Sequence, residues 1–556
     1  MNRPIQSAEP LTHLVEEYLS YLYEMHPTDA AFDGIHINDD LLENPSAGAL
    51  EAQGRELGGF RRRFEAIGSE ELTSVERLER RMLEDNVRGR IFEQEELQSW
   101  KREPRKYAET LAMSLAGQML FPYAPVEERA RRILSKLRQV PRFIEAARTN
   151  IDDPPGIFVK IGATAFEGTL TFIERDLPKA LSALDDPHLL GDLADASTEA
   201  SQTIQRYLEY LRDDLAPRCR GSFRLGRKHF EEKLRLEEGI TLEVDQLLAI
   251  GMRELRETQE EFRRVAGRLN GEDPHDAWSR VKDDHPSNAE LVPVVSQQVE
   301  ELSKFVERNA IVSIPQSESL VVAPTPEFFR WTFASMWTPG PFELNPDRAY
   351  YYITAADPNW PADRQNAHLR DFSHGALWCV SIHEAVPGHF LHFQHLRQVK
   401  SKSRKSILFS ASSFIEGWAH YCEEMMINAG FGRGDDHIRL GQLAEALIRL
   451  ARLVVGIKLH AEDYSVEQGV RFFRDEAFLE EGNARQEAER GTFDPSYIVY
   501  AVGKLMLLKL RTDYEAHRPA GYSLKDFHDT VLSNGAVPFW MHRKLMLGQN
   551  DGNLLD

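Results

Sequence analysis

Cysteine is scarce in this sequence of 556 residues, and Cys219, Cys379 and Cys422 lie far apart along the chain. An odd number of widely spaced cysteines argues against a disulfide framework and is typical of a reducing compartment. The first residues contain no apolar core of a signal peptide, and no run reaches the roughly 18 apolar residues that a membrane span requires. We therefore expect a cytoplasmic protein with no membrane partner.

Positive charge is also in short supply, with 67 lysines and arginines against 88 aspartates and glutamates and a formal net charge of −21. This balance argues against nucleic acid and anionic membranes as partners, and it favours solubility. The sequence contains no glycine-rich phosphate loop, no G-x-S-x-G elbow and no cysteine in an obvious nucleophile context. The sequence therefore does not indicate a nucleotide-binding enzyme, a serine hydrolase or a cysteine-dependent enzyme.

Hydrophobic residues make up 42% of the chain, which is enough for a large buried core. Residues 11–25 and 242–266 show the apolar stripe of amphipathic helices, as does much of the chain. Residues 310–326 and 342–361 are β-branched or aromatic and predict short strands. We expect a mainly α-helical protein with one small sheet. Residues 1–305 would form a helical part and residues 306–556 the catalytic part, with a soft boundary or as one structural unit.

The segment Trp378–Gln394 places three histidines and a glutamate in an apolar run, where such groups rarely lie without a partner or a role. His383 and His389 are six residues apart. An unbroken helix would place them roughly 120° apart around its axis and about 9 Å apart along it, too far to bind one ion. Pro387 interrupts a helix, and Gly388 permits unusual backbone angles. A break here can return the second histidine to the face of the first.

A third metal ligand is expected from residues 412–426, which predict a helix with Glu416, His420 and Glu423 on one face. Glu416 completes a His, His, Glu set with one open position, the arrangement of hydrolytic zinc sites. Glu384 follows the first histidine directly and would lie beside the water that the zinc ion binds. We expect Glu423 and His420 to contact the ligand residues rather than the metal.

Four segments occur together and in order: "HEAVPGHF", "FIEGWAHYCEEM", "RLARLVVGIKLHAEDYSVEQGVRFF" and "DPSYIVYAVGKLMLLKLR". In these segments the sequence resembles a large bacterial family that carries HExxPGH, is known as a domain of unknown function, and is grouped with the gluzincin zinc metallopeptidases. The resemblance covers nearly the whole chain and implies a helical peptide hydrolase with a deep cleft and a small sheet beside the metal helix. Phe390 stands where many members have a second histidine, and His420 where many have leucine.

The resemblance further implies that Tyr500 lies near the metal, where its hydroxyl would donate a hydrogen bond to the oxyanion. The alternative is an ordinary core tyrosine. Tyr500 and Lys504 share one face of an otherwise apolar helix, and Arg452 and His460 are embedded in apolar sequence. Arginine is costly to bury unless it is paired. Arg452 therefore either pairs with Glu445 or Glu423 or, with His460 and Lys504, binds a substrate carboxylate.

These residues lead us to expect a zinc-dependent hydrolase of peptide bonds in short peptides, carboxypeptidase-like or oligopeptidase-like, with Glu384 and Tyr500 as its catalytic residues. One alternative is a zinc hydrolase that acts on a non-peptide amide or ester, because the zinc chemistry is the same. The other is a non-catalytic helical scaffold whose histidines are core residues. The partner would be a short peptide or a small amide, and the sequence does not indicate an oligomeric state.

Overall fold

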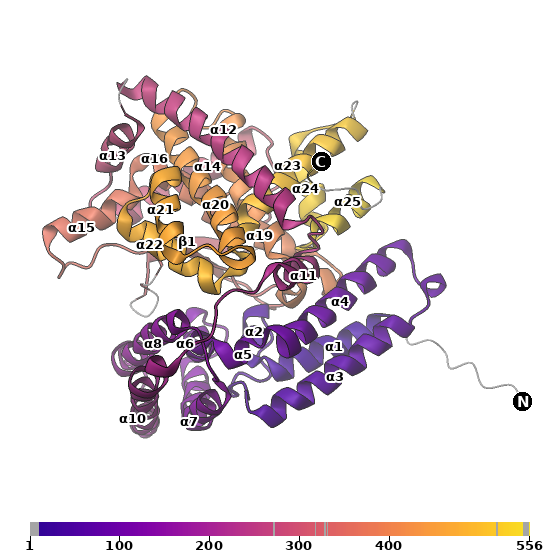
Figure 1. Ribbon diagram of the computed structural model, residues 1–556, viewed down its shortest axis with the longest axis vertical. Coiled ribbons are helices and arrows are strands. Elements are labelled where there is room, and N and C mark those ends of the chain that lie inside the picture. Colours follow the sequence, from indigo (N-terminus) through magenta and orange to yellow (C-terminus); the bar gives the residue numbers. More distant parts are fainter. Residues whose placement is uncertain are drawn as a thin grey trace, which may run out of the picture. The chain divides into compact units, whose positions relative to one another are not determined.

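The computed structural model describes residues 11–270, 273–316, 318–326, 330, 332–518, 521–548 and 555 (Figure 1). The described chain is mainly helical and has a three-stranded sheet, which confirms the expected fold class at this level. The N-terminal segment for which we expect no signal peptide lies outside the described residues. The chain forms two compact units, and the first contains Met1–Phe223, Pro339–Asn345 and Ser401–Phe409.

The first unit is built from helices whose apolar stripes face one another. Leu14, Tyr18 and Leu22 of the first helix are fully buried, as its sequence period predicts. A capping box joins Thr73 and Glu76 where the fourth helix begins. The α-helices of this unit are α1 (Leu11–Met25), α2 (Pro27–Asp33), α3 (Ala47–Ala66), α4 (Ser74–Phe92), α5 (Ser99–Arg102), α6 (Pro104–Leu120), α7 (Val126–Asn150), α8 (Gly156–Thr171), α9 (Leu177–Ala180), α10 (Pro187–Glu209) and α18 (Lys402–Lys405).

One stretch corrects the expectation that no run is long and apolar enough to span a membrane. Gly156–Ala180 passes that test by length and composition, with a mean hydropathy of 1.3 in its best window. In this fold the stretch forms α8, a short turn of π-helix and α9, and 44% of the window is buried. Helix α8 packs against α6 and α10. The stretch therefore behaves here as part of a helical core.

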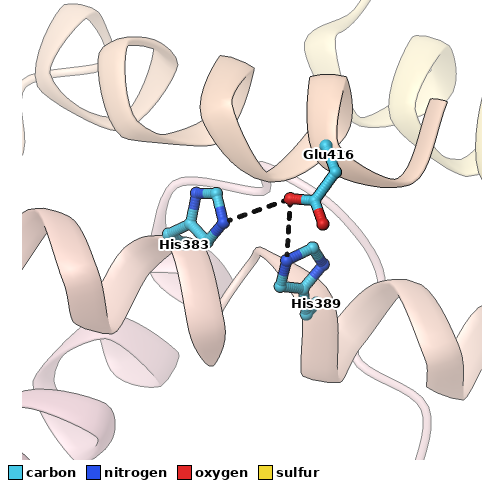
Figure 2. A group of neighbouring side chains, drawn as sticks. All are labelled: His383, His389 and Glu416. Atoms are coloured by element: carbon cyan, nitrogen blue, oxygen red, sulfur yellow. Dashed lines mark ion pairs between the residues drawn. The ribbon is translucent and has the colours of Figure 1, made fainter. Parts of the chain in front are cut away.

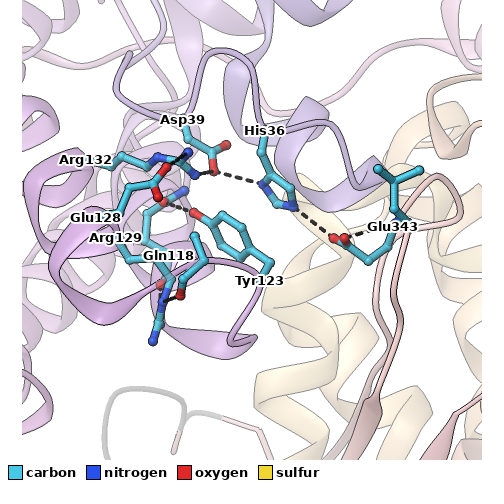
Figure 3. Close-up of polar contacts among 10 residues, drawn as sticks. His36, Asp39, Gln118, Tyr123, Glu128, Arg129, Arg132 and Glu343 are labelled. Carbon is cyan, nitrogen blue, oxygen red and sulfur yellow. Dashed lines mark hydrogen bonds and ion pairs between the residues drawn. The ribbon is translucent and has the colours of Figure 1, made fainter.

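The segment Pro339–Asn345 is bound into the first unit through His36 (Figure 3). His36 Nδ1 lies 2.9 Å from Asp39 Oδ2, and its Nε2 lies 2.9 Å from Glu343 Oε2. The ring of Tyr123 stacks on the imidazole with the ring centroids 3.7 Å apart. Burial lowers the pKa of His36, but the two carboxylates more than offset it and raise the pKa to about 9. The imidazolium therefore links two segments that are distant in the sequence.

The second unit begins at Arg224, so α11 to α14 belong with the helices that carry His383, His389 and Glu416 rather than with the part that we expected to end near residue 305. The physical reason is that α12 packs along the length of α20 (Figure 1). The α-helices of this unit are α11 (Arg227–Glu238), α12 (Val244–Asn270), α13 (Pro274–Asp283), α14 (Leu291–Arg308), α15 (Ala362–Leu369), α16 (His374–Glu384), α17 (His389–Gln398), α19 (Ser412–Asn428), α20 (Asp436–Ala461), α21 (Val466–Ala477), α22 (Glu481–Phe493), α23 (Val499–His517), α24 (Leu524–Ser533) and α25 (Phe539–Leu547).

The sheet of the second unit has the strand order β1-β3-β2. Strands β1 (Ser319–Pro324) and β3 (Arg348–Ile353) lie in the two predicted stretches and pair in parallel, with Val321 opposite Tyr350. Strand β2 (Ala334–Trp337) pairs antiparallel with β3 and was missed, because four residues are too few to show a period. Strand β2 contacts α16 and α17, so one edge of the sheet lies against the helices that carry His383 and His389.

Helix α19 lies within the second unit and contacts α16, α17, α20 and α23. Its N-cap residue, Ala411, has no side chain that can cap the helix. The backbone N–H of Ser413 instead donates to Glu238 Oε2 at 2.8 Å, so a buried carboxyl group from α11 satisfies the start of α19. Burial raises the pKa of Glu238 from 4.5 to about 7, and the hydrogen bonds from Ser413 oppose that rise only in part.

Glu238 should make the stability of the protein fall as the pH rises. A raised pKa means that the folded state binds the proton more tightly than the unfolded state between about pH 4.5 and about pH 7. The carboxyl group therefore opposes folding increasingly across this window, by up to roughly 3 kcal/mol. Glu238→Gln keeps an acceptor for Ser413 and removes the titration. Thermal unfolding from pH 5 to pH 8 should show the Tm of the variant rising relative to wild type.

Glu232→Gln is the matched control, because Glu232 lies on the same helix and pairs with Arg235 near the surface. This variant should retain the wild-type dependence of Tm on pH. Identical curves for Glu238→Gln and wild type would show that the buried carboxyl group does not titrate in this range.

Candidate metal centre

The helix that carries the first histidine ends as the sequence predicts. Helix α16 ends at Glu384 and α17 begins at His389, and the residues between them include Pro387 in a cis peptide bond. The backbone N–H of Gly388 donates to the carbonyl of Ile382 at 3.0 Å, which folds the break back onto the last turn of α16. The interruption therefore brings the start of one helix beside the end of the other.

Glycine at position 388 is required by close approach rather than by a left-handed conformation. A Cβ atom here would lie 1.8 Å from the carbonyl oxygen of His383 and 2.4 Å from that of Ile382. On the other side of the break, the indole N–H of Trp418 donates to the carbonyl of Pro387 at 2.8 Å. Hydrogen bonds from two helices thus hold the break in place.

The structure brings together the three side chains predicted to bind a metal (Figure 2). His383, His389 and Glu416 each offer a ligand atom, and these atoms all lie within 4.8 Å of one another. Glu416 Oε2 lies 3.6 Å from His383 Nε2 and 3.5 Å from His389 Nε2. Tetrahedral ligands at about 2.0–2.1 Å from zinc are roughly 3.3–3.4 Å apart. The spacing of these atoms therefore suits one zinc ion.

Glu423 orients the first histidine from behind. Its Oε1 lies 2.8 Å from His383 Nδ1, and its Oε2 lies 3.2 Å from His420 Nδ1. Arg449 Nη2 lies 3.6 Å from the same carboxylate. A carboxylate on one ring nitrogen sets the tautomer and turns the other nitrogen toward the metal, as in many zinc sites. Glu423 thus contacts a predicted ligand directly, whereas His420 contacts only Glu423 among the residues of this cluster.

The electrostatics of this cluster favour a cation. Burial lowers the pKa of His383, but hydrogen bonds with Glu416 and Glu423 more than compensate and raise it to about 9. Burial raises the pKa of Glu416, yet the positive charge of His389 and the histidine hydrogen bonds hold it well below its usual range. The carboxylates therefore stabilise positive charge at the point where the ligand atoms meet. The donor set and this field together fit zinc.

Glu384 is the last residue of α16 and is half-buried. Its negative charge contributes to the raised pKa values of His383 and of Tyr351, so its carboxylate lies within electrostatic range of the cluster. Among the described residues it forms no side-chain hydrogen bond or ion pair. The Glu384 carboxylate therefore lies in range of the cluster and is not paired with another described side chain.

Tyr500 lies on α23, which packs against α19. Burial and the negative charge of Glu416 raise the pKa of its hydroxyl, so the phenol lies within electrostatic range of the third predicted ligand. The two helices can approach because glycines face each other. A Cβ on Gly417 would lie 2.6 Å from Gly503 Cα, and one on Gly503 would lie 1.9 Å from the carbonyl oxygen of Ser413. This glycine contact lets α23, which carries Tyr500, pack closely against α19, which carries Glu416.

The three predicted carboxylate-binding residues have other partners. Arg452 makes a bidentate ion pair with Glu487, with nitrogen–oxygen distances of 2.7 and 2.8 Å. His460 is buried with Nε2 2.7 Å from the carbonyl of Gly491, and burial lowers its pKa to about 4. Lys504 pairs with a glutamate, as described next. Arg452 therefore has a structural ion-pair partner, which is Glu487 rather than Glu445 or Glu423.

Lys504 Nζ lies 2.6 Å from Glu424 Oε2, and this charge pair lowers the pKa of the carboxyl group to about 2. Sequence reasoning also missed Arg490, which pairs with Asp494 and has its Cζ atom 5.9 Å from the centroid of the Tyr500 ring. The only signal was its spacing of four residues before Asp494, which suits an ion pair on a helix but says nothing about a tyrosine.

A family model matches residues 27–546, which is nearly the whole chain. The chain belongs to the DUF885 family. This family is described as a bacterial protein of unknown function, so membership confirms the expected resemblance at the level of the family and assigns no activity. No curated protein matches the chain.

Two solved structures share the fold of this DUF885 member from end to end. One, described as "a putative lipoprotein of unknown function" from Shewanella oneidensis, is 24% identical, with a TM-score of 0.81 over 97% of this chain and 100% of that chain. The other, described as a "putative lipoprotein" from Colwellia psychrerythraea, is 16% identical, with a TM-score of 0.83 over 98% of this chain and 99% of that chain. At these identities the likeness shows the fold alone.

The description of both neighbours as lipoproteins contradicts the cytoplasmic location that we expected. That expectation is withdrawn. Its main argument was the low cysteine count, and a protein whose few cysteines are unpaired can equally occur in an oxidising compartment. Cys379 and Cys422 are indeed free and buried here, as core residues.

Gly388→Ala should sharply reduce zinc affinity while the protein stays folded. The added methyl group would overlap the carbonyl oxygen of His383, so α17 must shift and take His389 with it. Misplacing a ligand should cost at least the tenfold that loss of a supporting residue typically costs. Calorimetric zinc titration with far-UV circular dichroism would measure both properties. Gly482→Ala is the control, because its methyl group would have no neighbour within 4 Å. Unchanged zinc affinity in Gly388→Ala would contradict the assigned ligands.

Proposed function

We propose that this protein is a zinc-dependent hydrolase of peptide bonds in short peptides, with a gluzincin-like active site and a substrate cleft. The observation that carries the proposal is the convergence of His383, His389 and Glu416. Glu384 and Tyr500 lie within electrostatic range of this cluster. His, His, Glu sites with an open position belong to hydrolytic zinc enzymes, whereas structural zinc sites are filled by four protein ligands.

When bound, zinc polarises the scissile carbonyl and lowers the pKa of a bound water. Glu384 accepts a proton from the attacking water and passes it to the leaving nitrogen, because an amide nitrogen leaves poorly unless it is protonated. Glu423 keeps the His383 ring in the required orientation. The Tyr500 hydroxyl donates a hydrogen bond to the oxygen on which negative charge develops.

The sheet supports a peptide as the substrate. In the order β1-β3-β2, strand β2 is an edge strand, and it contacts α16 and α17. An extended peptide can add to such an edge through backbone hydrogen bonds, which recognise the main chain rather than a particular side chain. A non-peptide amide or ester would make no use of this edge.

The charge pairs favour an oligopeptidase over a carboxypeptidase. Arg452 is engaged by Glu487 and Lys504 by Glu424, and the imidazole of His460 hydrogen bonds to a backbone carbonyl. A substrate carboxylate would have to displace these partners. We propose cleavage within short peptides, without recognition of the free C-terminus by these residues. The lipoprotein descriptions of the structural neighbours support action outside the cytoplasm.

Glu384→Gln tests the proposed chemistry. The variant should bind zinc as wild type does, because Glu384 is not one of the ligands, and should lose hydrolysis by a factor of about 10² to 10⁴. Zinc content by elemental analysis and turnover of a panel of short peptides would measure the two properties. Wild-type turnover in the variant would contradict Glu384 as the base, and loss of zinc would make it a ligand.

The same panel separates the remaining functions. Cleavage of simple esters or amides without cleavage of any peptide would favour the other class of zinc hydrolase. Failure of the wild-type protein to bind zinc would favour the non-catalytic scaffold.

A second prediction concerns the C-terminus of the substrate. Matched peptides with a free acid and an amidated C-terminus should be cleaved with kcat/KM values within about twofold of each other. A hydrogen-bonded ion pair with the carboxylate would instead cost about tenfold or more on amidation. A strong preference for the free acid would restore the carboxypeptidase alternative.

A further inference from the structure

Two segments whose neighbours in the chain belong to the second unit are packed in the first. Pro339–Asn345 lies between β2 and β3, and Ser401–Phe409 lies between α17 and α19. In the proposed function these neighbouring elements are the edge strand that takes the peptide and the helices that carry His389 and Glu416. We call these elements, together with His383, the proposed active centre. The first unit supplies none of its ligands but holds two of the connections between its elements.

Asp33, the last residue of α2, contacts both segments. Its Oδ2 accepts a hydrogen bond from Ser406 Oγ at 2.5 Å, and its Oδ1 accepts one from the backbone N–H of Ile407 at 3.1 Å. Its carbonyl oxygen accepts from the backbone N–H of Phe342 at 2.9 Å. Asp33 is fully buried, and the Tyr23 hydroxyl also donates to its Oδ2, at 2.6 Å. One buried residue of the first unit therefore anchors both connections.

The segment after β2 also packs backbone against backbone with the end of α2. A Cβ atom on Gly340 would lie 2.3 Å from Gly34 N, and one on Gly34 would lie 2.4 Å from Glu343 N. Figure 3 shows Glu343 of the same segment reaching His36. Because backbone atoms make this contact, no flexible side chain can yield when the segment moves. The end of α2 and this segment are therefore held as one piece.

The connections are too short to absorb a displacement. Residue 338 alone separates the first segment from β2, and residues 399–400 and 410–411 separate the second segment from α17 and α19. An extended chain spans at most about 3.6 Å per residue, so these linkers have little slack. A shift of either segment therefore reaches the element beside it. Helix α19 resists such a shift better than β2, because Glu238 also holds its first turn.

We infer that Asp33 is a positioning residue for the proposed active centre: its carboxyl group holds the segment that joins the helices of His389 and Glu416, and its carbonyl holds the segment that joins β2 to β3. This inference rests on the proposed function for its catalytic consequence. Its effects on metal geometry and on local opening of the chain can be measured without turnover.

The metal half is tested on the Co²⁺-substituted protein, whose visible absorption reports the geometry of the ligands. Asp33→Ala removes the acceptor of Ser406 and Ile407. It should shift the absorption and weaken Co²⁺ binding by about threefold to tenfold, below the loss of about 10- to 100-fold that is typical for a residue touching a ligand. Asp33→Asn keeps an acceptor for Ile407, and the hydroxyls of Tyr23 and Ser406 can accept from its amide, so most of the affinity should return. Wild-type absorption and affinity in Asp33→Ala would overturn the inference.

The peptide half is tested with Gly340→Ala. The added methyl group would overlap the backbone of Gly34, so the segment after β2 must shift. For peptides long enough to pair with β2, kcat/KM should fall by about 10- to 100-fold, because a displacement of about 1 Å can cost about 10²-fold in rate. A single amide that is too short to pair with the strand should be cleaved as by wild type, and the Co²⁺ absorption should not change. Equal losses for long and short substrates would overturn the inference.

Two further variants complete the comparison. Glu16→Gln removes an ion pair with Lys402 of the same segment, in which both side chains are exposed, and should leave absorption and kinetics unchanged. If Asp33→Ala does not fold, Ser406→Ala decides the metal half, because it removes one of the donors to Asp33 and should shift the Co²⁺ absorption in the same direction as Asp33→Asn. An unshifted absorption in Ser406→Ala would then overturn the inference.

Amide hydrogen exchange tests the connection without metal or substrate. Asp33→Ala should speed exchange at Ile407 and also in the last turn of α17 and the first turns of α19, because loss of an anchor lowers the free energy of local opening. Faster exchange confined to Ser401–Phe409 would overturn the inference. Failure of the wild-type protein to cleave any peptide would instead refute the proposed function, and the exchange and absorption results would still decide the role of Asp33.

Discussion

The close packing of Gly388 against the end of α16 is the constraint on which the metal cluster depends. No side chain fits at this position, because the carbonyl oxygens of Ile382 and His383 occupy the space. The N–H of Gly388 donates to the Ile382 carbonyl, so the chain reverses and begins α17 with His389. Two histidines that a continuous helix would hold apart therefore face the same point.

Helix α19 supplies the other half of the cluster and is positioned at three places along its length. Near its N-terminus the buried Glu238 accepts from Ser413. In its middle Trp418 donates to the carbonyl of Pro387, which joins α19 directly to the break between the metal-site helices. Gly417 packs against α23 and lets that helix approach. The direction of the Glu416 side chain follows from these contacts, none of which involves Glu416 itself.

Charge pairing decides what the basic residues near the cluster can do. The embedded arginines are compatible either with structural pairing or with a substrate carboxylate when only the sequence is considered. In the fold, Arg452 meets Glu487 and Arg490 meets Asp494. Removing the carboxylate from a guanidinium as buried as that of Arg452 leaves an uncompensated charge that costs about 3–5 kcal/mol. Arg452 is therefore poorly suited to bind and release a substrate.

Local sequence patterns were sufficient to predict the helices that carry His383, His389 and Glu416. The spacing of His383 and His389 around Pro387 predicts a helix break, and the period of residues 412–426 predicts a helix carrying Glu416 and Glu423, because both features depend on residues within two or three turns. Strand β2 escaped notice because it is short and is defined only by its pairing with β3. The sequence also did not predict the boundary between the two units, because that boundary depends on the packing of α12 against α20.

The sequence by itself determined that this protein is mainly helical and that two histidines and a glutamate are available as metal ligands. The tertiary structure alone decided that these three meet, that Glu423 hydrogen bonds to His383, and that Arg452 pairs with Glu487. The physical reason is that helical periodicity states which face a side chain occupies but not which helix lies against that face. That choice depends on close contacts such as that between Gly417 and Gly503, which join residues far apart in the chain.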